Sequence, residues 1–189
     1  MSLFERNLAE HLALFSELGH LEPVVTGAGR AIAKGLAAGG KVMFCGNGGS
    51  AADSQHLAAE FTGRFVADRR PLAGLALSTD SSALTCISND YGYEHVFTRQ
   101  VQALGKEGDC LVGISTSGNS PNIVNAFIHA RSAGIVTIGL LGRDGGALAS
   151  LSDIAIIVPS AVTARIQEAH ILIGHSLCGM AEEMLDLLP

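Results

Sequence analysis

Five short, uninterrupted apolar runs constrain the fold of this chain more than any other feature of its sequence. They occupy residues 42–45, 72–77, 110–114, 135–141 and 154–158. Continuous rather than alternating hydrophobicity is typical of strands that are covered on both faces, as in parallel sheets. Most segments between the runs are long enough for the crossover helices that parallel strands need. The sequence therefore predicts a five-stranded parallel sheet.

Helices are expected between these strands and at both ends of the chain. Apolar residues recur at helical spacing over 3–36, with an interruption at 19–22 before Pro23, which predicts two N-terminal helices. Further helices are expected at 50–65, 82–104, 120–133, 147–151 and about 164–187. This alternation predicts an α/β fold, a doubly wound sandwich that binds ligands beyond the carboxyl ends of its strands.

The length and composition predict one globular domain. A chain of 189 residues, 48% hydrophobic and 16% charged, has enough apolar side chains to fill a core. We expect one domain over 1–189, with N-terminal helices at 1–37 and the sandwich at 38–189. The formal net charge of -6 gives no electrostatic reason to bind nucleic acid. An anionic ligand would therefore have to be held by local groups.

The cysteines and the apolar runs indicate a cytoplasmic protein. No pair of cysteines has CxxC spacing, and three of the four lie in apolar runs, which predicts reduced, buried thiols at Cys45, Cys86, Cys110 and Cys178. No apolar run approaches the ~18 residues of a membrane span. The first residues carry glutamates rather than a basic leader. We expect neither secretion nor a membrane partner.

A glycine-rich loop follows the first predicted strand. Gly46-Asn47-Gly48-Gly49-Ser50 stands directly before a predicted helix. Glycines let a ligand approach the main chain closely, and the N–H groups of a helix N-terminus attract anions. The same glycines could simply form a tight strand-to-helix turn, so this loop alone leaves both interpretations open.

A loop rich in hydroxyl groups follows the third predicted strand. It reads Ser115-Thr116-Ser117-Gly118-Asn119-Ser120-Pro121, and Pro121 suits the first turn of a helix. One helix needs only one capping side chain, so the surplus hydroxyls favour an anion or a polyol as ligand. We therefore expect a phosphate site, with helix capping alone as the alternative.

Polar side chains on two predicted helices indicate a second centre. His56 and Glu60 are four residues apart in the helix at 50–65, so they project from one face and could share a metal ion or a hydrogen bond. Polar residues also interrupt an apolar stretch of the last helix, at Gln167, Glu168, His170 and His175. Burying such groups without partners would be costly, so we expect each to be satisfied.

Five motifs together resemble one known family. They are CGNGGSAAD at 45–53, QHLAAEFTGRF at 55–65, SNDYGY at 88–93, GISTSGNSPN at 113–122 and ARIQEAHILIGH at 164–175. The two loops resemble the phosphosugar-binding SIS (sugar isomerase) domain, and the five motifs in this order resemble the phosphoheptose isomerase family over nearly the whole chain. The resemblance implies a flavodoxin-like, three-layer sandwich with helices on both faces and an N-terminal helical extension.

The resemblance also implies the residues of an active site. The metal ligands would be His56, Glu60, Gln167 and His175, with one zinc ion per subunit. The substrate would be bound by both loops, the SNDYGY motif and the last helix, through Asn47, Gly48, Gly49, Ser50, Asn89, Asp90, Ser115, Thr116, Ser117, Ser120 and Gln167. Asn89 and Asp90 could equally form a turn before Tyr-Gly.

The reaction that the resemblance implies is the isomerisation of sedoheptulose 7-phosphate to D-glycero-D-manno-heptose 7-phosphate through an enediolate. Such a reaction needs a base and an acid. We assign proton abstraction to Glu60 and protonation to His175. Zinc would orient and polarise the reacting oxygens. The product would enter ADP- or GDP-heptose synthesis for lipopolysaccharide or another surface glycan.

The spacing of two implied ligands leads to an inference about assembly. Gln167 and His175 are eight residues apart in one helix, a rise of about 12 Å. One ion would not reach both from a single helix, so we expect different copies of the chain to donate them. The protein would then be an obligate homo-oligomer, and the resemblance implies a homotetramer.

Other polar residues receive no firm role. Arg64 follows Glu60 by four residues and could contact substrate or pair with that carboxylate. Ala164 stands where the enterobacterial isomerases have an acidic residue, so a carboxylate role does not carry over. No chemistry is assigned to four isolated histidines, His11, His20, His95 and His129.

Two other functions stay open at this point. One relative in the family is a non-catalytic, tetrameric adaptor that binds the bacterial replication initiator, and it would share the fold and the loops. An isomerase of a hexulose or pentulose phosphate would keep the phosphate loops and change the sugar contacts. The four retained ligand positions favour an enzyme over an adaptor.

Overall fold

A five-stranded parallel sheet forms the centre of the computed structural model, which describes residues 1–188. The strands are β1 (Val42–Gly46), β2 (Gly74–Ala76), β3 (Cys110–Ser115), β4 (Val136–Gly142) and β5 (Ile154–Val158). Their order is β2-β1-β3-β4-β5, and every neighbouring pair is parallel. This is the flavodoxin-like order, so the predicted fold class is confirmed. Pro189, the last residue of the predicted domain, lies outside the described residues.

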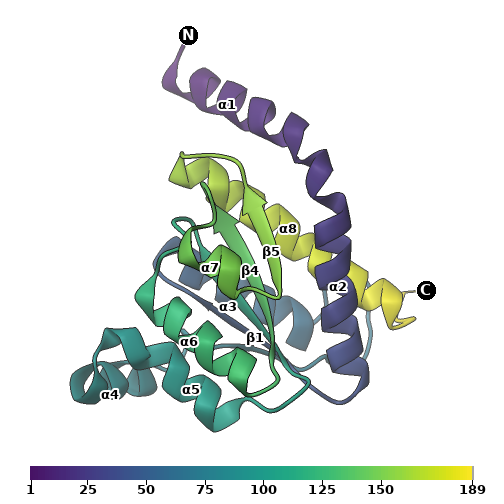
Figure 1. Ribbon diagram of the computed structural model, residues 1–189. Coiled ribbons are helices and arrows are strands. Elements are labelled where there is room, and N and C mark those ends of the chain that lie inside the picture. The colour runs from purple at the N-terminus through teal and green to yellow at the C-terminus, as the bar shows by residue number, and fades with distance from the viewer. Residues whose placement is uncertain (189) are drawn as a thin grey trace.

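Helices cover both faces of the sheet (Figure 1). In chain order they are α1 (Leu3–Glu17), the 3-10 turn η1 (Leu18–Leu21), α2 (Glu22–Ala37), α3 (Gly49–Thr62), α4 (Ser81–Tyr91), the 3-10 turn η2 (Tyr93–His95), α5 (Val96–Leu104), α6 (Pro121–Ser132), α7 (Gly146–Leu151) and α8 (Thr163–Met184). Alternate residues of β1 face opposite sides: Phe44 packs with α2, α3 and α8, whereas Met43 packs with α5, α6 and α7. The burial of both faces explains why the strands read as continuous apolar runs.

The topology places the carboxyl ends of β1 and β3 at the ligand-binding edge. The chain runs from β1 to β2 on one side and returns to β3 on the other, so β1 and β3 flank the switch point of the sheet. Gly46 at the end of β1 pairs with Ile114 near the end of β3. The glycine-rich loop after β1 and the hydroxyl-rich loop after β3 therefore emerge side by side.

Four predicted elements differ from the structure by more than one residue, and one of them is the helix expected at about 164–187, which ends at Met184. The helix expected at 82–104 is broken at Gly92, whose φ of 93° and ψ of 152° end α4 before η2 begins. The strand expected at 72–77 contains only Gly74–Ala76. The helix expected at 50–65 ends earlier, at Thr62. Each difference lies at an element end or at a glycine, where periodicity carries least information.

Three of the four cysteines are buried. Cys45, Cys110 and Cys178 are buried and free as predicted, but Cys86 is exposed because α4 buries none of its residues.

The N-terminal helix α1 extends away from the body of the molecule, as Figure 1 shows, and Leu14 is its only buried residue. Within residues 1–188, no helix is long and apolar enough to cross a bilayer.

Candidate active site

The first loop leaves main-chain N–H groups available at the start of α3. Gly48 adopts φ 56° and ψ -121°, which favours glycine and turns the chain from β1 into the helix. Within residues 1–188, neither Gly48 nor Gly49 donates its main-chain N–H to another main-chain group. Ser50, in contrast, is only 4% exposed and lies beneath the loop. The geometry is that of an anion site at a helix N-terminus.

The second loop is organised around one buried hydroxyl. Ser115 is 3% exposed, and its Oγ accepts a hydrogen bond from the Gly118 main-chain N–H at 3.1 Å. The same oxygen lies 3.1 Å from Ser120 Oγ and 3.5 Å from Ser117 Oγ. Thr116, Ser117 and Ser120 are partly exposed. Ser115 thus shapes the loop, while the three partly exposed hydroxyls remain accessible to a ligand.

The last helix contributes Gln167 to the first loop. A Cβ built on Gly49 would come within 2.5 Å of Gln167 Nε2, so the amide lies directly over the glycine. Only a residue without a side chain allows this approach. Gln167 therefore lies at the predicted phosphate loop within one chain.

Three of the four predicted metal ligands converge. His56 and Glu60 project from α3, and His175 joins them from α8; their ligand atoms all lie within 4.8 Å of one another. His56 Nε2 is 2.9 Å from His175 Nε2 and 3.3 Å from Glu60 Oε1. Two imidazole nitrogens at this separation either share one proton or direct both lone pairs at a cation.

The donor set fits a zinc ion. With bonds of about 2.0–2.1 Å, the ligand atoms of a tetrahedral zinc ion lie roughly 3.3 Å apart, which is close to the two distances from His56 Nε2. Asp53, one turn before His56 on α3, has a buried Oδ2 without a hydrogen-bond partner within residues 1–188. Burial raises the pKa of the Asp53 carboxyl, and the imidazoles of His56 and His175 oppose that rise. A cation here would satisfy groups that the protein alone leaves facing one another.

A buried ion pair between Arg69 and Glu182 supports the cluster of His56, Glu60 and His175. Arg69 and Glu182 have side chains only 2% and 0% exposed, with Arg69 Nε 2.6 Å from Glu182 Oε1. Arg69 Nη2 donates to the main-chain O of Glu60 at 2.7 Å. Phe65, whose main-chain N–H donates to Glu182 Oε1 at 3.0 Å, stacks its ring 5.4 Å from that of His175. None of Arg69, Glu182 or Phe65 was selected from the sequence.

Within residues 1–188, Asn89, Asp90 and Arg64 form no hydrogen bond with either loop. Asn89 and Asp90 lie exposed in α4 rather than in a turn, and Asn89 Nδ2 donates to Asp90 Oδ1 at 2.8 Å. Tyr93, from the same motif, reaches the first loop instead, where its hydroxyl lies 2.9 Å from Asn47 Oδ1. Arg64 lies beyond the end of α3 and forms no ion pair with Glu60 within the described chain.

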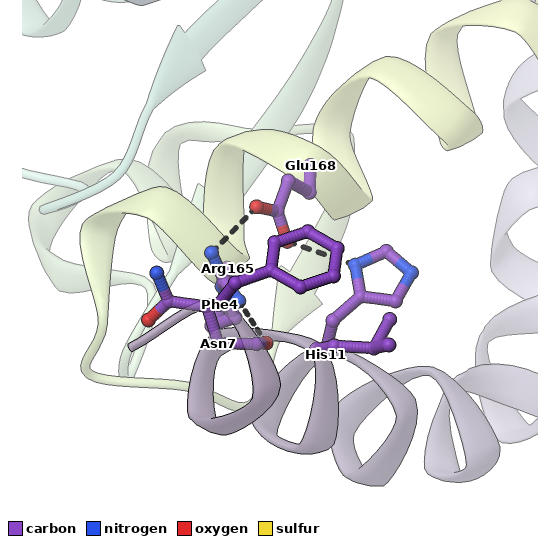
Figure 2. Close-up of a pocket in the computed structure, with 6 residues that line it drawn as sticks. Phe4, Asn7, His11, Arg165 and Glu168 are labelled. Atoms are coloured by element: carbon purple, nitrogen blue, oxygen red, sulfur yellow. Dashed lines mark hydrogen bonds and ion pairs between the residues drawn. The ribbon is translucent and has the colours of Figure 1, made fainter. Parts of the chain in front are cut away.

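The N-terminal helix is fastened to the helix that carries Gln167 and His175 (Figure 2). Arg165 donates to the main-chain O of Asn7 and, at 2.7 Å, to Glu168 Oε1. His11 Nδ1 lies 2.9 Å from Glu168 Oε2, and its ring stacks on Phe15 at 3.8 Å. His11, which received no chemical role from the sequence, is therefore a satisfied side chain whose partner lies on α8, far away in sequence.

His170, another polar residue of α8, is buried in the protein interior instead of lying at the site. It is fully buried, and its Nε2 lies 3.0 Å from the main-chain O of Leu141. Burial lowers the pKa of His170 to about 4, and the hydrogen bond to Leu141 opposes this shift. The imidazole is therefore neutral and holds α8 against β4.

Comparison with known proteins gives a consistent result. The family model of the SIS domain matches residues 7–142. A phosphoheptose isomerase of Rhodospirillum rubrum is 53% identical over 171 residues, which are 90% of this chain and 91% of that protein.

Solved structures of two such enzymes superpose closely. The phosphoheptose isomerase of Neisseria gonorrhoeae gives a TM-score of 0.89 at 47% identity, covering 96% of this chain and 100% of the other. That of Francisella tularensis gives a TM-score of 0.92 at 36% identity, covering 97% of this chain and 100% of the other.

Proposed function

The chain belongs to the phosphoheptose isomerases of the SIS domain family, and on that premise we propose that it converts sedoheptulose 7-phosphate to D-glycero-D-manno-heptose 7-phosphate. It is a sugar-phosphate isomerase. One observation carries the finer proposal: α3 begins in the first glycine loop and bears His56 and Glu60 farther along, where His175 meets them. A single helix thus links a site suited to phosphate with groups suited to proton transfer.

The residues of the cluster suit an enediolate mechanism. Glu60 takes a proton from C1 of the ketose, which leaves an enediolate across C1 and C2. His175 supplies a proton to C2, and the proton of the C1 hydroxyl passes to the C2 oxygen, which completes the aldose. Glu60 Oε1 faces His56 at 3.3 Å, so Oε2 is the oxygen better placed to carry the substrate proton.

Phosphate would be held by the two loops. The N–H groups of Gly48 and Gly49 and the hydroxyls of Thr116, Ser117 and Ser120 offer donors to its oxygens without a cationic side chain. This agrees with a chain of net charge -6 that has to bind an anion locally. Gln167, Asn89 and Asp90 remain proposed contacts of the sugar.

One zinc ion per subunit is the proposed cofactor. His56, Glu60 and His175 would hold it, with Gln167 as the fourth ligand. When bound, zinc would polarise the carbonyl and hydroxyl of the substrate.

We propose a homo-oligomer, a tetramer, in which a second copy supplies Gln167 to each metal site. Within one chain the Gln167 side chain lies against Gly49. Gln167 also precedes His175 by eight residues on the same helix. The exposed apolar residues of α1 support assembly, because a soluble monomer rarely leaves such a face uncovered; they are Leu3, Phe4, Leu8 and Leu12. A crystal structure with all four ligands from one chain would contradict the shared site.

The cellular setting follows from the substrate. A cytoplasmic enzyme of this kind would supply ADP- or GDP-heptose synthesis for lipopolysaccharide or another surface glycan. The convergence of His56, Glu60 and His175 favours an enzyme over the adaptor, because an adaptor needs no such cluster.

The test is a coupled assay of zinc-loaded protein with sedoheptulose 7-phosphate, run beside hexulose and pentulose phosphates. Glu60→Gln and His175→Ala are compared with the exposed controls Glu107→Gln and His20→Ala, and zinc content is measured in each. We expect turnover of the heptulose that both site variants lose and both controls keep. No turnover by folded, zinc-loaded protein would contradict the proposal, and faster turnover of a shorter sugar would change the substrate.

A further inference from the structure

Three polar side chains from separate segments form one hydrogen-bonded unit at the mouth of the site. Asn47 Nδ2 donates to Asn122 Oδ1 at 3.0 Å, and Asn122 Nδ2 donates to Asn47 Oδ1 at 2.9 Å. The Tyr93 hydroxyl donates to the same Asn47 Oδ1 at 2.9 Å. If both amides were turned over, the three contacts would persist, because a tyrosine hydroxyl can also accept.

This unit ties together the two loops that face the ligand. Asn47 lies in the first loop, just before the start of α3, whereas Asn122 is the second residue of α6. Asn122 is only 2% exposed, so its amide has no access to solvent and depends on Asn47 for its partners. The reciprocal amide pair therefore fixes the distance between the N-termini of α3 and α6.

The separation of these two helix ends matters for an anion bound between them. The first end presents the main-chain N–H groups of Gly48 and Gly49, and the second lies beside the partly exposed hydroxyls of Thr116, Ser117 and Ser120. Donors bind an anion well only when they are held at the correct spacing before it arrives. The side chain of Asn47 is itself engaged by Asn122 and Tyr93, so its amide serves the loop rather than the ligand.

We propose that Asn122 and Tyr93 are positioning residues for phosphate binding, which act through Asn47 to hold the α3 and α6 N-termini in register. The proposal rests on the proposed phosphosugar function and names two residues that the function did not include. It predicts that their loss weakens ligand binding while the acid/base step, carried by residues farther along α3 and α8, is largely unaffected.

The test is a double-mutant cycle with inorganic phosphate as the probe. Phosphate affinity is measured by calorimetry for Asn47→Ala, Asn122→Ala and the double variant, and KM and kcat for the heptulose are measured in parallel. We expect Asn122→Ala to weaken phosphate binding and raise KM by about tenfold, with kcat changed less than about twofold. The double variant should bind no more weakly than Asn47→Ala alone, because Asn122 acts through Asn47.

Two controls separate positioning from general damage to the fold. Asn125→Ala removes the same side chain one turn farther along α6, where the amide donates to the main-chain O of Glu94 at 3.1 Å, and it should keep phosphate affinity. Tyr93→Phe removes only an exposed hydroxyl, and we expect about a twofold to threefold loss of phosphate affinity. Tyr91→Phe, whose ring lies under Arg99, should have no effect.

The outcomes distinguish this inference from the proposed function. Additive losses in the cycle, or unchanged phosphate affinity in both Asn122→Ala and Tyr93→Phe, would overturn the positioning role even if the wild type isomerises the heptulose. Coupled losses of phosphate affinity would support it even if the heptulose is not the substrate. If Asn122→Ala fails to fold, the comparison of Tyr93→Phe with Tyr91→Phe decides the question.

Discussion

Replacement of Arg69 by methionine should be among the most destabilising single changes in this chain. The Arg69–Glu182 pair is almost completely buried, and Arg69 also donates to the main-chain O of Phe61 at 2.9 Å and of Gly63 at 3.1 Å. Methionine fills much of the space but leaves the Glu182 carboxylate without its counter-charge. The carbonyl groups at the end of α3 lose their donor as well.

The magnitude follows from the burial of the pair. Removing one partner of a buried ion pair costs about 3–5 kcal/mol, because the other charge stays buried without compensation. For a chain of this size each kcal/mol lowers the Tm by about 2–4 °C, so the expected fall is roughly 6–20 °C. Adding Glu182→Leu to Arg69→Met removes the orphaned charge and should restore part of the lost stability.

Thermal and urea unfolding at one fixed protein concentration measure these effects, since assembly would make the Tm depend on concentration. Arg70→Met is the matched control, because Arg70 is the exposed neighbour and its loss should cost less than about 0.5 kcal/mol. The reasoning would be refuted if Arg69→Met were as stable as Arg70→Met. It would equally fail if the double variant were less stable than Arg69→Met.

Three further predictions concern single sites. Burial lowers the pKa of His170 to about 4. Between that pH and about 6.5, the unfolded chain therefore binds a proton that the folded chain does not bind. The free energy of unfolding should fall by about 3 kcal/mol as the pH drops through this window. Urea titrations should show a flatter pH dependence in His170→Gln, and equal slopes would contradict the prediction. Gly49→Ala displaces the Gln167 amide, which would lie 2.5 Å from the new Cβ, and should raise KM roughly tenfold with little change in Tm; an unchanged KM would show that the amide is not part of the site. His56→Ala should lower zinc affinity at least about a hundredfold in a chelator competition, and full zinc retention would remove His56 from the ligand set.

The sheet could be predicted from the sequence because its strands are buried on both faces. Each of the five apolar runs overlaps an observed strand, and the two loops lie at adjacent strand ends. Periodicity could not reveal the break at Gly92, since a glycine with positive φ interrupts a helix without changing the apolar pattern around it. Strand 74–76 is shorter than its apolar run, because hydrophobicity marks burial rather than hydrogen bonding.

The chemistry of the site was partly visible in short-range spacing. His56 and Glu60 stand one helical turn apart, and that spacing alone brings them together. The contacts that support them join residues distant in sequence: 113 positions separate Arg69 from Glu182. Similarly, 75 positions separate Asn47 from Asn122. No local pattern distinguishes such residues from ordinary surface polar groups, so only the folded structure identifies them.

Deuterium incorporation is the most direct test of the central claim, that Glu60 and His175 move a proton between adjacent carbons of a heptulose phosphate. The reaction is run in D2O with sedoheptulose 7-phosphate, and the aldose product is examined by NMR. Protonation of an enediolate by an exchangeable acid predicts deuterium at C2 of the product, and no product from Glu60→Gln. Turnover that leaves C2 without deuterium, or that persists in Glu60→Gln, would contradict the account.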